Sequence, residues 1–476
     1  MDTLARILGQ IHTSRAPLET VTALCDDYDS RWPGSGSDKD ACEYMADLLR
    51  DYGLEEVHVE SFTIPGWIRG SSRLQVLEPK EKEIECIALP MSCRGEVEAE
   101  LVNLGPGPLN VYEDRRDEIE GRVAMVSSAN PPGMARYLHR SEKYQRTVMA
   151  GAVGWIFMNH YPAYGPPTGG ISPIIPAVGV SYEDGAYLAR LLERWGRVKV
   201  RLETECTNKT VETYNVVADL PGTAGSQEWL VYGAHYDGHD ISVGALDDAT
   251  GAAIVIELAR VLSQERSHLK HNTRFILFGA EEIGLYGSRA YCRDHPDFVD
   301  QVRFMLNFDA AGRAGRQGFC LHDWPQLEPL FKEIIRETGL DLPLWSRVGP
   351  YSDHWPFLLR GVATATMGDP EEAARRGGRG YGHTKYDTVD KVDLRAMREC
   401  AANAAVAAYH ILNLDKWPAP KRTQEEIEAI IEKAGIHETV RLGQRLKEYL
   451  EARRESLRPE TLDYLKKLSG NMEEVI

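Results

Sequence analysis

The apolar and polar positions of the chain predict several kinds of segment in order. Residues 17 to 53 carry apolar side chains at helical spacing, and a turn-rich stretch over residues 31 to 37 interrupts them. A strand is predicted over residues 56 to 62. From about residue 96 to 205, short β-type runs alternate with turns rich in Pro and Gly. We therefore expect an inserted β-rich domain in that region.

Beyond residue 228 the pattern changes to apolar, strand-like runs that alternate with helical segments. This alternation is typical of βαβ units and predicts an α/β fold with a mixed, mostly parallel central sheet flanked by helices. Residues 419 to 476 are highly charged and have apolar positions at helical spacing. We expect them to form amphipathic helices that pack on the body of the protein or on a partner chain. The predicted segments are residues 1–95, 96–205, 206–418 and 419–476.

Length and charge narrow the class of protein. A chain of 476 residues is several times the size of a typical domain, so we expect a large core and at least one accessory unit. Its 55 Lys and Arg against 72 Asp and Glu give a formal net charge of −17. Such an acidic chain is a poor candidate for binding nucleic acid or an anionic membrane. The carboxylates favour a different use, because metal cations need oxygen ligands.

The cysteines and the first residues indicate a compartment. The eight cysteines are scattered and form no C-x-x-C pair, so we expect reduced thiols. The first ten residues lack the basic start and the apolar stretch of a signal peptide. No run of about 18 apolar residues occurs. From these features we expect a cytoplasmic protein.

Candidate ligand residues follow the apolar runs of the α/β region. In an open α/β sheet, ligands bind beyond the carboxyl ends of the strands. Runs that start at residues 229, 274 and 302 end shortly before a histidine or a carboxylate, and a fourth run precedes a Gly-rich loop with a histidine. The residues in question are His235, Asp237, Glu281, Glu282, Asp309 and His383. Asp247 and Asp248 lie where a helix is predicted to begin, and the helix dipole favours a carboxylate there.

Residues of these types can hold two zinc ions. Two imidazoles and three carboxylates, one of them bridging, leave a charge of about +1 on two Zn²⁺ ions, which a bound hydroxide neutralises. One of the adjacent glutamates is then available as a general base, because neighbouring residues leave a strand end in different directions. Asp237, two residues after His235, can orient the imidazole. Each residue alone has an ordinary explanation as a surface charge or a cap, but five in order at strand ends favour one shared site.

Six segments resemble the co-catalytic zinc aminopeptidase family, which includes bacterial leucyl aminopeptidases and glutamate carboxypeptidase-like enzymes. They are residues 234–237, 244–251, 280–288, 306–309, 352–354 and 383–388. The resemblance implies the zinc exopeptidase fold and two zinc ions bridged by Asp247. The implied ligands are Asp247, Glu282 and His383 for one ion, and Asp247, His235 and Asp309 for the other. The resemblance also implies that Glu281 is the general base and that Asp237 supports His235.

The insert resembles a protease-associated domain. The segments that carry this resemblance are residues 121–126, 148–157, 175–180 and 184–188. In the family such an insert is thought to border the active-site cleft and restrict access to it. Without the resemblance, the same region is equally well explained as a β-rich spacer with no site of its own.

Together these features predict a zinc-dependent exopeptidase that acts on peptides, with an aminopeptidase as the leading hypothesis. A carboxypeptidase of the same family is an alternative, and so is a glutaminyl-cyclase-like transferase, although the insert argues against it. A non-catalytic receptor or scaffold on a peptidase body is a third alternative, but all five ligand positions are present. Arg375, Arg376 and Arg379 are most simply explained as solvated charges, and the alternative is an anchor for a substrate carboxylate. The C-terminal helices could also join two copies into a homo-oligomer.

Overall fold

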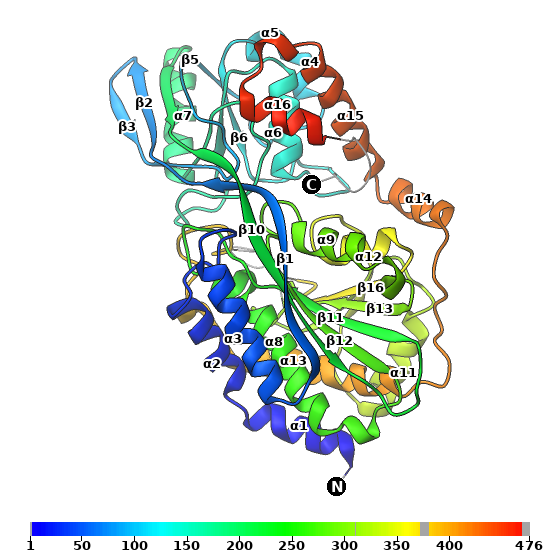
Figure 1. Cartoon of the computed structure of the whole chain (residues 1–476). Coiled ribbons are helices and arrows are strands. Elements are labelled where there is room, and N and C mark those ends of the chain that lie inside the picture. Colours follow the sequence, from blue (N-terminus) through cyan, green and yellow to red (C-terminus); the bar gives the residue numbers. More distant parts are fainter. Residues whose placement is uncertain (1, 310, 372–379, 469–476) are drawn as a thin grey trace. The chain divides into compact units, whose positions relative to one another are not determined.

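The structure is a computed structural model that describes residues 2–309, 311–371 and 380–468 (Figure 1). Within these residues, the strands form two mixed sheets of eight strands each. Packing divides the chain into two units. The first unit comprises residues 1–64, 212–382 and 387–434, and the second comprises residues 65–211, 383–386 and 435–476.

The sheet that lies mainly in the first unit is parallel at its centre. Its strands are β1 (Glu55–Ile68), β10 (Thr207–Leu220), β11 (Trp229–His235), β12 (Asn272–Phe278), β13 (Val302–Asn307), β14 (Gly318–Leu321), β15 (Leu344–Trp345) and β16 (Ala363–Gly368). Their order is β1-β10-β12-β11-β13-β16-β14-β15. β11 pairs in parallel with β12 and β13, and β13 with β16, whereas β10 and β14 join antiparallel. The predicted mixed, mostly parallel sheet is confirmed.

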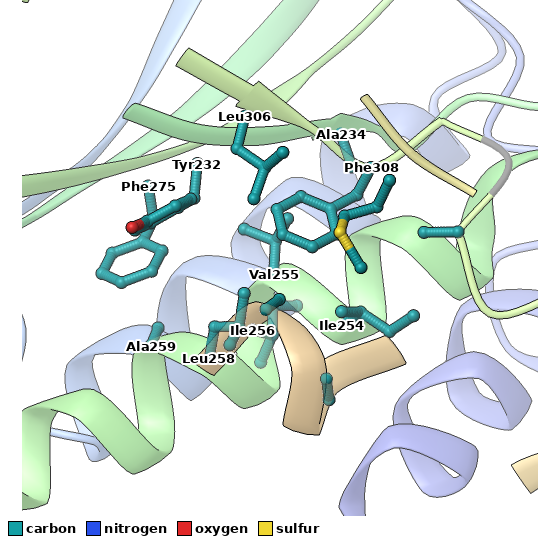
Figure 2. Close-up of a cluster of buried hydrophobic side chains, with 14 of the residues drawn as sticks. Tyr232, Ala234, Ile254, Val255, Ile256, Leu258, Ala259, Phe275, Leu306 and Phe308 are labelled. Atoms are coloured by element: carbon teal, nitrogen blue, oxygen red, sulfur yellow. The ribbon is translucent and has the colours of Figure 1, made fainter. Parts of the chain in front are cut away.

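Helices cover both faces of this sheet. On one face lie α8 (Thr250–Gln264) and α13 (Leu394–Leu412), and Figure 2 shows Val255 and Leu258 of α8 among the side chains that pack with the strands. On the other face, Val231 and Met305 pack with residues of α9 (Tyr286–Asp294) and α12 (His354–Leu359). Successive strand residues point to opposite faces, so a strand buried on both faces is a continuous apolar run. The remaining helices of this unit are α1 (Thr3–Thr13), α2 (Ala16–Asp26), α3 (Ser37–Asp51), α10 (Pro296–Val299), α11 (Glu328–Thr338) and α14 (Gln424–Lys433).

The N-terminal pattern is confirmed with one omission. α2 and α3 occupy the segment predicted to be helical, the turn over residues 31 to 37 separates them, and the predicted strand lies within β1. α1 was not predicted. It precedes the first periodic segment and buries Ile7 and Ile11 in the same core.

The second unit contains the other sheet. Its strands are β2 (Ser72–Glu78), β3 (Lys82–Ile84), β4 (Cys86–Ala88), β5 (Gly95–Asn103), β6 (Val123–Ser127), β7 (Gly154–Met158), β8 (Ala177–Val180) and β9 (Lys199–Thr204), in the order β3-β2-β9-β5-β6-β7-β8-β4. The strands β5 to β8 pair in parallel, and the others join antiparallel. Its helices before residue 211 are α4 (Val111–Asp114), α5 (Arg116–Ile119), α6 (Arg140–Met149) and α7 (Tyr182–Trp195).

The C-terminal helices bury their apolar faces against their own chain. α14 belongs to the first unit, whereas α15 (His437–Glu451) and α16 (Pro459–Lys467) belong to the second. Leu446, Leu450 and Leu465 of these two helices share a core with Tyr144 and Trp155. The sequence predicted that these helices pack on the body of the protein or on a partner chain. α15 and α16 pack on the body of the protein. Across the described parts of the chain, no helix has the length and hydropathy that a membrane crossing requires.

Candidate metal centre

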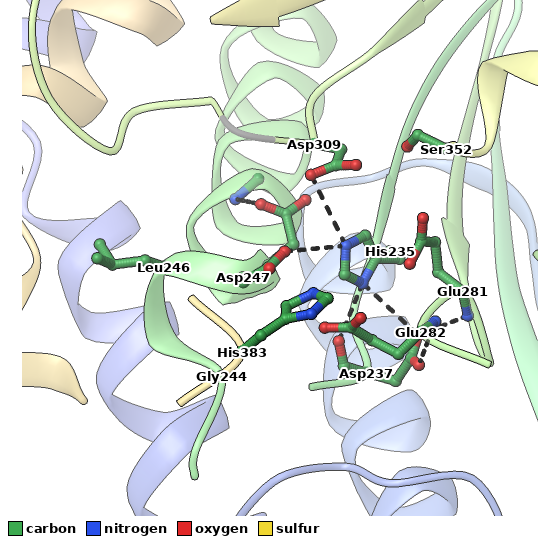
Figure 3. Close-up of polar contacts among 12 residues, drawn as sticks. His235, Asp237, Gly244, Leu246, Asp247, Glu281, Glu282, Asp309, Ser352 and His383 are labelled. Atoms are coloured by element: carbon green, nitrogen blue, oxygen red, sulfur yellow. Dashed lines mark hydrogen bonds and ion pairs between the residues drawn. The ribbon is translucent and has the colours of Figure 1, made fainter. Parts of the chain in front are cut away.

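Three neighbouring strands of the first unit end at one edge of the sheet and bring the candidate ligands together. His235, the last residue of β11, pairs with the last residue of β12, and the end of β13 pairs with the same part of β11. Glu281, Glu282 and Asp309 follow β12 and β13, so they emerge at this edge too. Figure 3 shows their carboxylates grouped around the ring of His235.

The imidazole of His235 faces two carboxylates. Its Nε2 lies 3.5 Å from Oδ1 of Asp247 and 3.9 Å from Oδ1 of Asp309, while its Nδ1 lies 2.9 Å from the backbone carbonyl oxygen of Asp237. A carbonyl oxygen only accepts, so Nδ1 carries the proton in the neutral ring and Nε2 directs a lone pair at the carboxylates. The separation from Asp247 fits two ligands of one ion, since bonds from zinc to nitrogen or oxygen are about 2.0–2.2 Å long, and the separation from Asp309 is slightly greater.

Burial and charge shift the pKa values at this edge. Burial by itself lowers the pKa of an imidazole, but the charge of Glu281 and the contact with Asp237 raise the pKa of His235 well above its ordinary value. Burial also raises the pKa of the Asp248 carboxyl far above its ordinary value. Metal ligands must lose their protons before they bind an ion.

Asp237 supports two neighbouring segments. Its carboxylate accepts hydrogen bonds from the backbone N–H groups of Glu281 at 3.1 Å and Glu282 at 3.3 Å. The Oδ1 atom of the same carboxylate lies 3.6 Å from Nδ1 of His235, which is longer than the contact with the backbone carbonyl. The sequence analysis expected the carboxylate to orient His235. In the structure the carbonyl makes the closer contact, because the carboxylate also holds the two glutamates.

Asp247 and Asp248 lie in the irregular turn Ala245–Ala249 that precedes α8. Both are buried and have non-helical backbone angles. Among the described residues, Oδ2 of Asp248 is buried without a hydrogen-bond partner. Ligand atoms of His235, Asp248 and Asp309 lie within 4.8 Å of one another. The structure therefore brings both aspartates to the centre, and Asp248 joins Asp247 as a candidate ligand.

Glu281 and Glu282 have different surroundings. Burial raises the pKa of Glu281 well above its ordinary value, His235 opposes this shift, and the charges of Asp309 and Glu282 add to it. Oε2 of Glu282 lies 2.9 Å from Nε2 of His239, and both side chains are buried. The sequence analysis did not identify His239. The available signal was only a second histidine four residues after His235.

Arg313 is a second residue that the sequence analysis missed. Its Nη2 lies 2.8 Å from Oδ1 of Asp247 and 3.2 Å from Oδ1 of Asp309, and its Nε donates to the carbonyl oxygen of Leu246 at 2.7 Å. The guanidinium thus lies between two candidate ligands. Its sequence signal is weak, because an arginine in a Gly-rich turn is usually solvated.

Asp387 fixes the turn that holds Asp247. Its Oδ1 accepts from the N–H of Leu246 at 2.7 Å, and its Oδ2 accepts from the N–H of Asp247 at 3.1 Å. Asp387 belongs to the segment 383–388 on which the family resemblance depended, but no role was predicted for it. The structure assigns it the support of a candidate ligand.

The segment Ser352-Asp-His354 adds buried polar groups near Asp309. Asn307 donates to Oγ of Ser352 at 2.7 Å. Burial raises the pKa of Asp353 to about 7 and lowers the pKa of His354 to about 4. The charge of Asp309 acts on both groups. His354 is therefore neutral at physiological pH.

His383 is described with the second unit, to which residues 383–386 belong. Its carbonyl oxygen accepts from the N–H of Thr168 at 2.8 Å, and its Nδ1 lies 3.2 Å from the carbonyl oxygen of Thr168. Nη1 of Arg140, which can only donate, lies 3.4 Å from the same Nδ1, so this nitrogen contacts both a donor and an acceptor. Arg375, Arg376 and Arg379 lie outside the described residues.

The fold and the centre define a class. Histidine and carboxylate ligands at the carboxyl edge of a mixed α/β sheet, with a glutamate of raised pKa beside them, are the features of a metal-dependent hydrolase. Residues 215–408 match the model of peptidase family M28, and residues 97–188 match the model of the PA domain. Residues 215–408 therefore form a peptidase family M28 domain, and residues 97–188 form a PA domain ahead of it. Both resemblances stated from the sequence are confirmed.

Relatives with different activities in their names cover most of the chain. Carboxypeptidase Q of Mus musculus is 25% identical over 411 residues, which is 84% of this chain and 86% of the relative. Aminopeptidase YwaD of Bacillus subtilis (strain 168) is 26% identical over 428 residues, 86% of this chain and 87% of the relative. Both polarities of exopeptidase therefore occur among proteins to which this chain is similar.

Solved structures share the fold. A peptidase M28 precursor of Shewanella amazonensis SB2B superposes with a TM-score of 0.74 at 22% sequence identity. The superposition covers 88% of this chain and 98% of the precursor chain. BSAP, described as a zinc aminopeptidase from Bacillus subtilis, has a TM-score of 0.65 at 22% identity, with 85% of this chain and 97% of its own covered. The predicted fold class is confirmed.

Proposed function

We propose that this chain is a zinc-dependent exopeptidase that removes N-terminal residues from peptides. The observation that carries the proposal is the group formed by His235, Asp247, Asp248 and Asp309 at the sheet edge, with Glu281 beside it. The peptidase family M28 domain supports a peptide substrate. The name aminopeptidase, given to YwaD and BSAP, supports the polarity.

The residues fit zinc. Imidazole nitrogen and carboxylate oxygen are zinc ligands, and the buried Oδ2 of Asp248, which has no hydrogen-bond partner among the described residues, supports a bound cation at this edge. We propose that Asp247 bridges two ions, that Glu282 and His383 complete one site, and that His235 and Asp309 complete the other. When bound, the ions supply Lewis acidity for the peptide carbonyl and lower the pKa of water.

The family resemblance supports His383 as a ligand, and so does its position in the sequence close to Asp387. Three residues separate it from Asp387, whose carboxylate holds the turn of Asp247. The four steps along the chain from His383 to Asp387 span at most about 14 Å. We take Nε2 of His383 as the ligand atom, because Nδ1 contacts the carbonyl oxygen of Thr168 and the guanidinium of Arg140.

Glu281 is the proposed general base and acid. Burial raises its pKa above the ordinary value, which makes the carboxylate a stronger base for taking a proton from water before it returns that proton to the leaving amine. Asp237 holds the backbone of Glu281 and so fixes the position of this group. Asp237 would therefore act by positioning, both on Glu281 and on His235.

Glu281→Gln tests the proposed base. We expect turnover of a peptide substrate to fall by at least about 100-fold, since general-base catalysis contributes roughly 10²–10⁴-fold, while both zinc ions remain bound. Steady-state hydrolysis and metal analysis by mass spectrometry measure the two quantities. Glu333→Gln on the exposed surface of α11 is the control and should match the wild type. Wild-type turnover in Glu281→Gln would remove Glu281 from the mechanism.

Blocked peptides test the polarity, for which carboxypeptidase Q supplies the competing hypothesis. The enzyme should cleave a peptide with a free N-terminus and an amidated C-terminus, and it should leave an N-acetylated peptide intact. Mass spectrometry of the products identifies the residue released. Cleavage of the N-acetylated peptide alone would identify a carboxypeptidase.

We also propose a cytoplasmic location and keep self-association as a separate proposal. All eight cysteines are free thiols, which supports a reducing compartment. Self-association through the C-terminal helices draws no support from Leu446 and Leu450, because they are buried in their own chain. Cell fractionation tests the first proposal and sedimentation velocity tests the second.

A further inference from the structure

We propose that His239 is a ligand of the metal ion that Glu282 binds. This inference rests on the proposed metal-dependent function and adds a protein ligand to one of its two sites. Nε2 of His239 lies 2.9 Å from Oε2 of Glu282. The two side chains are only 1% and 2% exposed, so both groups have been removed from water.

The distance between these atoms suits two ligands of one ion. Zinc binds imidazole nitrogen and carboxylate oxygen at about 2.0–2.2 Å, so neighbouring ligand atoms on one ion lie about 2.8–3.6 Å apart for bond angles between 90° and 110°. The observed separation lies within this range. Burying an imidazole beside a carboxylate is costly unless both are satisfied, and a shared cation satisfies both at once.

The fold holds the imidazole in this position. The N–H of Gly238 donates to the carbonyl oxygen of Ser30 at 2.8 Å, which fixes the backbone immediately before His239. The ring of Trp32 packs against the ring of His239, with centroids 5.8 Å apart and planes inclined by 32°. Both contacts come from the segment that links α2 to α3. The position of Nε2 is therefore set by the first unit itself.

A ligand role makes the two metal sites unequal. The site of Glu282 would have one more protein ligand than the site of His235, so we expect it to retain its ion longer when a chelator is added. The competing role is a hydrogen bond in which His239 only donates to Glu282. Glutamine separates the two roles, because it keeps an N–H donor but lacks the imidazole nitrogen.

The experiment is a zinc titration of the full chain against a competing chelator. We expect the wild type to bind two ions, and we expect His239→Gln to weaken one of the two sites by at least about tenfold while the other is unchanged. His239→Ala should weaken the same site. His271→Gln is the matched control, because Nε2 of that histidine contacts the carbonyl oxygen of Leu414 at 2.7 Å and His271 is not a candidate ligand, so the variant should bind zinc as the wild type does.

X-ray absorption of the wild type tests the same point without a substitution that could prevent folding. Three imidazoles on two ions give about 1.5 per zinc, whereas two imidazoles give about 1.0. A value of about 1.0, or wild-type affinity at both sites of His239→Gln, would overturn the ligand role of His239. A wild type that binds no zinc at all would instead overturn the proposed function.

Discussion

A guanidinium contacts two candidate metal ligands at once. Arg313 contacts Asp247 and Asp309 with one nitrogen, and its side chain is 10% exposed. The carboxylates of buried Asp247 and half-buried Asp309 repel each other, and the arginine offsets that repulsion. Arg313 therefore keeps the ligands assembled in the metal-free protein. A bound ion would take over part of this task.

Arg313→Ala should consequently destabilise the metal-free protein more than the zinc-loaded protein. Removing one partner of a buried ion pair lowers the free energy of unfolding by about 3–5 kcal/mol. Bound zinc would compensate the charge of the carboxylates that lose their arginine. Thermal unfolding with zinc and with a chelator measures both losses. Arg336→Ala, on the exposed surface of α11, should change neither. Equal losses with and without zinc would show that Arg313 acts as an ordinary structural ion pair.

The residues that the sequence did not reveal depend on distant partners. Arg313 contacts a residue 66 positions away, and Asp387 holds the N–H of a residue 140 positions away. Spacing rules describe neighbours on one helix or strand, so they carry no information on such contacts. His235, Asp247 and Asp309 could be predicted because each follows a local signal, a strand end or a helix start.

At the scale of elements, burial explains which strands could be predicted. The apolar runs that start at residues 229, 274 and 302 became β11, β12 and β13, whose residues are almost all buried. A strand covered on both faces has no polar alternation and is visible as a continuous run. The turn Ala245–Ala249 could not be predicted, because its non-helical angles depend on tertiary contacts such as those of Asp387.

The start of α8 is packed so closely that it tolerates only glycine at residue 251. A Cβ atom on Gly251 would lie 2.2 Å from Oδ2 of Asp248 and 2.6 Å from the carbonyl oxygen of Phe308. Gly251→Ala should destabilise the protein by about 1–3 kcal/mol and reduce its zinc content, since the aspartate must move.

Gly9→Ala in α1 is the matched control for this substitution. It places a methyl group in open space and should stabilise the protein by about 0.5–1 kcal/mol. Chemical denaturation and metal analysis measure both variants. An unchanged zinc content in Gly251→Ala would show that metal binding does not depend on the position of the Asp248 side chain.

At the scale of the whole molecule, the net charge of −17 has two parts. Most carboxylates are spread over the surface, where they favour solubility. A smaller group, which includes Asp237, Asp247, Glu281 and Asp309, is gathered at one sheet edge of the first unit. Two zinc ions would offset about four of these charges, so the loaded protein is less acidic than its sequence. The composition alone could not locate this group, because it contains no information on position.

The C-terminal helices complete the core of the second unit, and this division of the molecule can be tested. Leu446 of α15 is fully buried in the cluster that contains Trp155 of β7. Leu446→Ala should cost about 2–5 kcal/mol and lower the amide protection of β6 and β7. Glu448→Ala, on the exposed side of the same helix, should leave protection unchanged. Hydrogen exchange followed by mass spectrometry resolves each strand, and the strands β11, β12 and β13 serve as the internal reference because the first unit has its own core. Loss of protection confined to α15 itself would show that the helix is an appendage rather than part of that core.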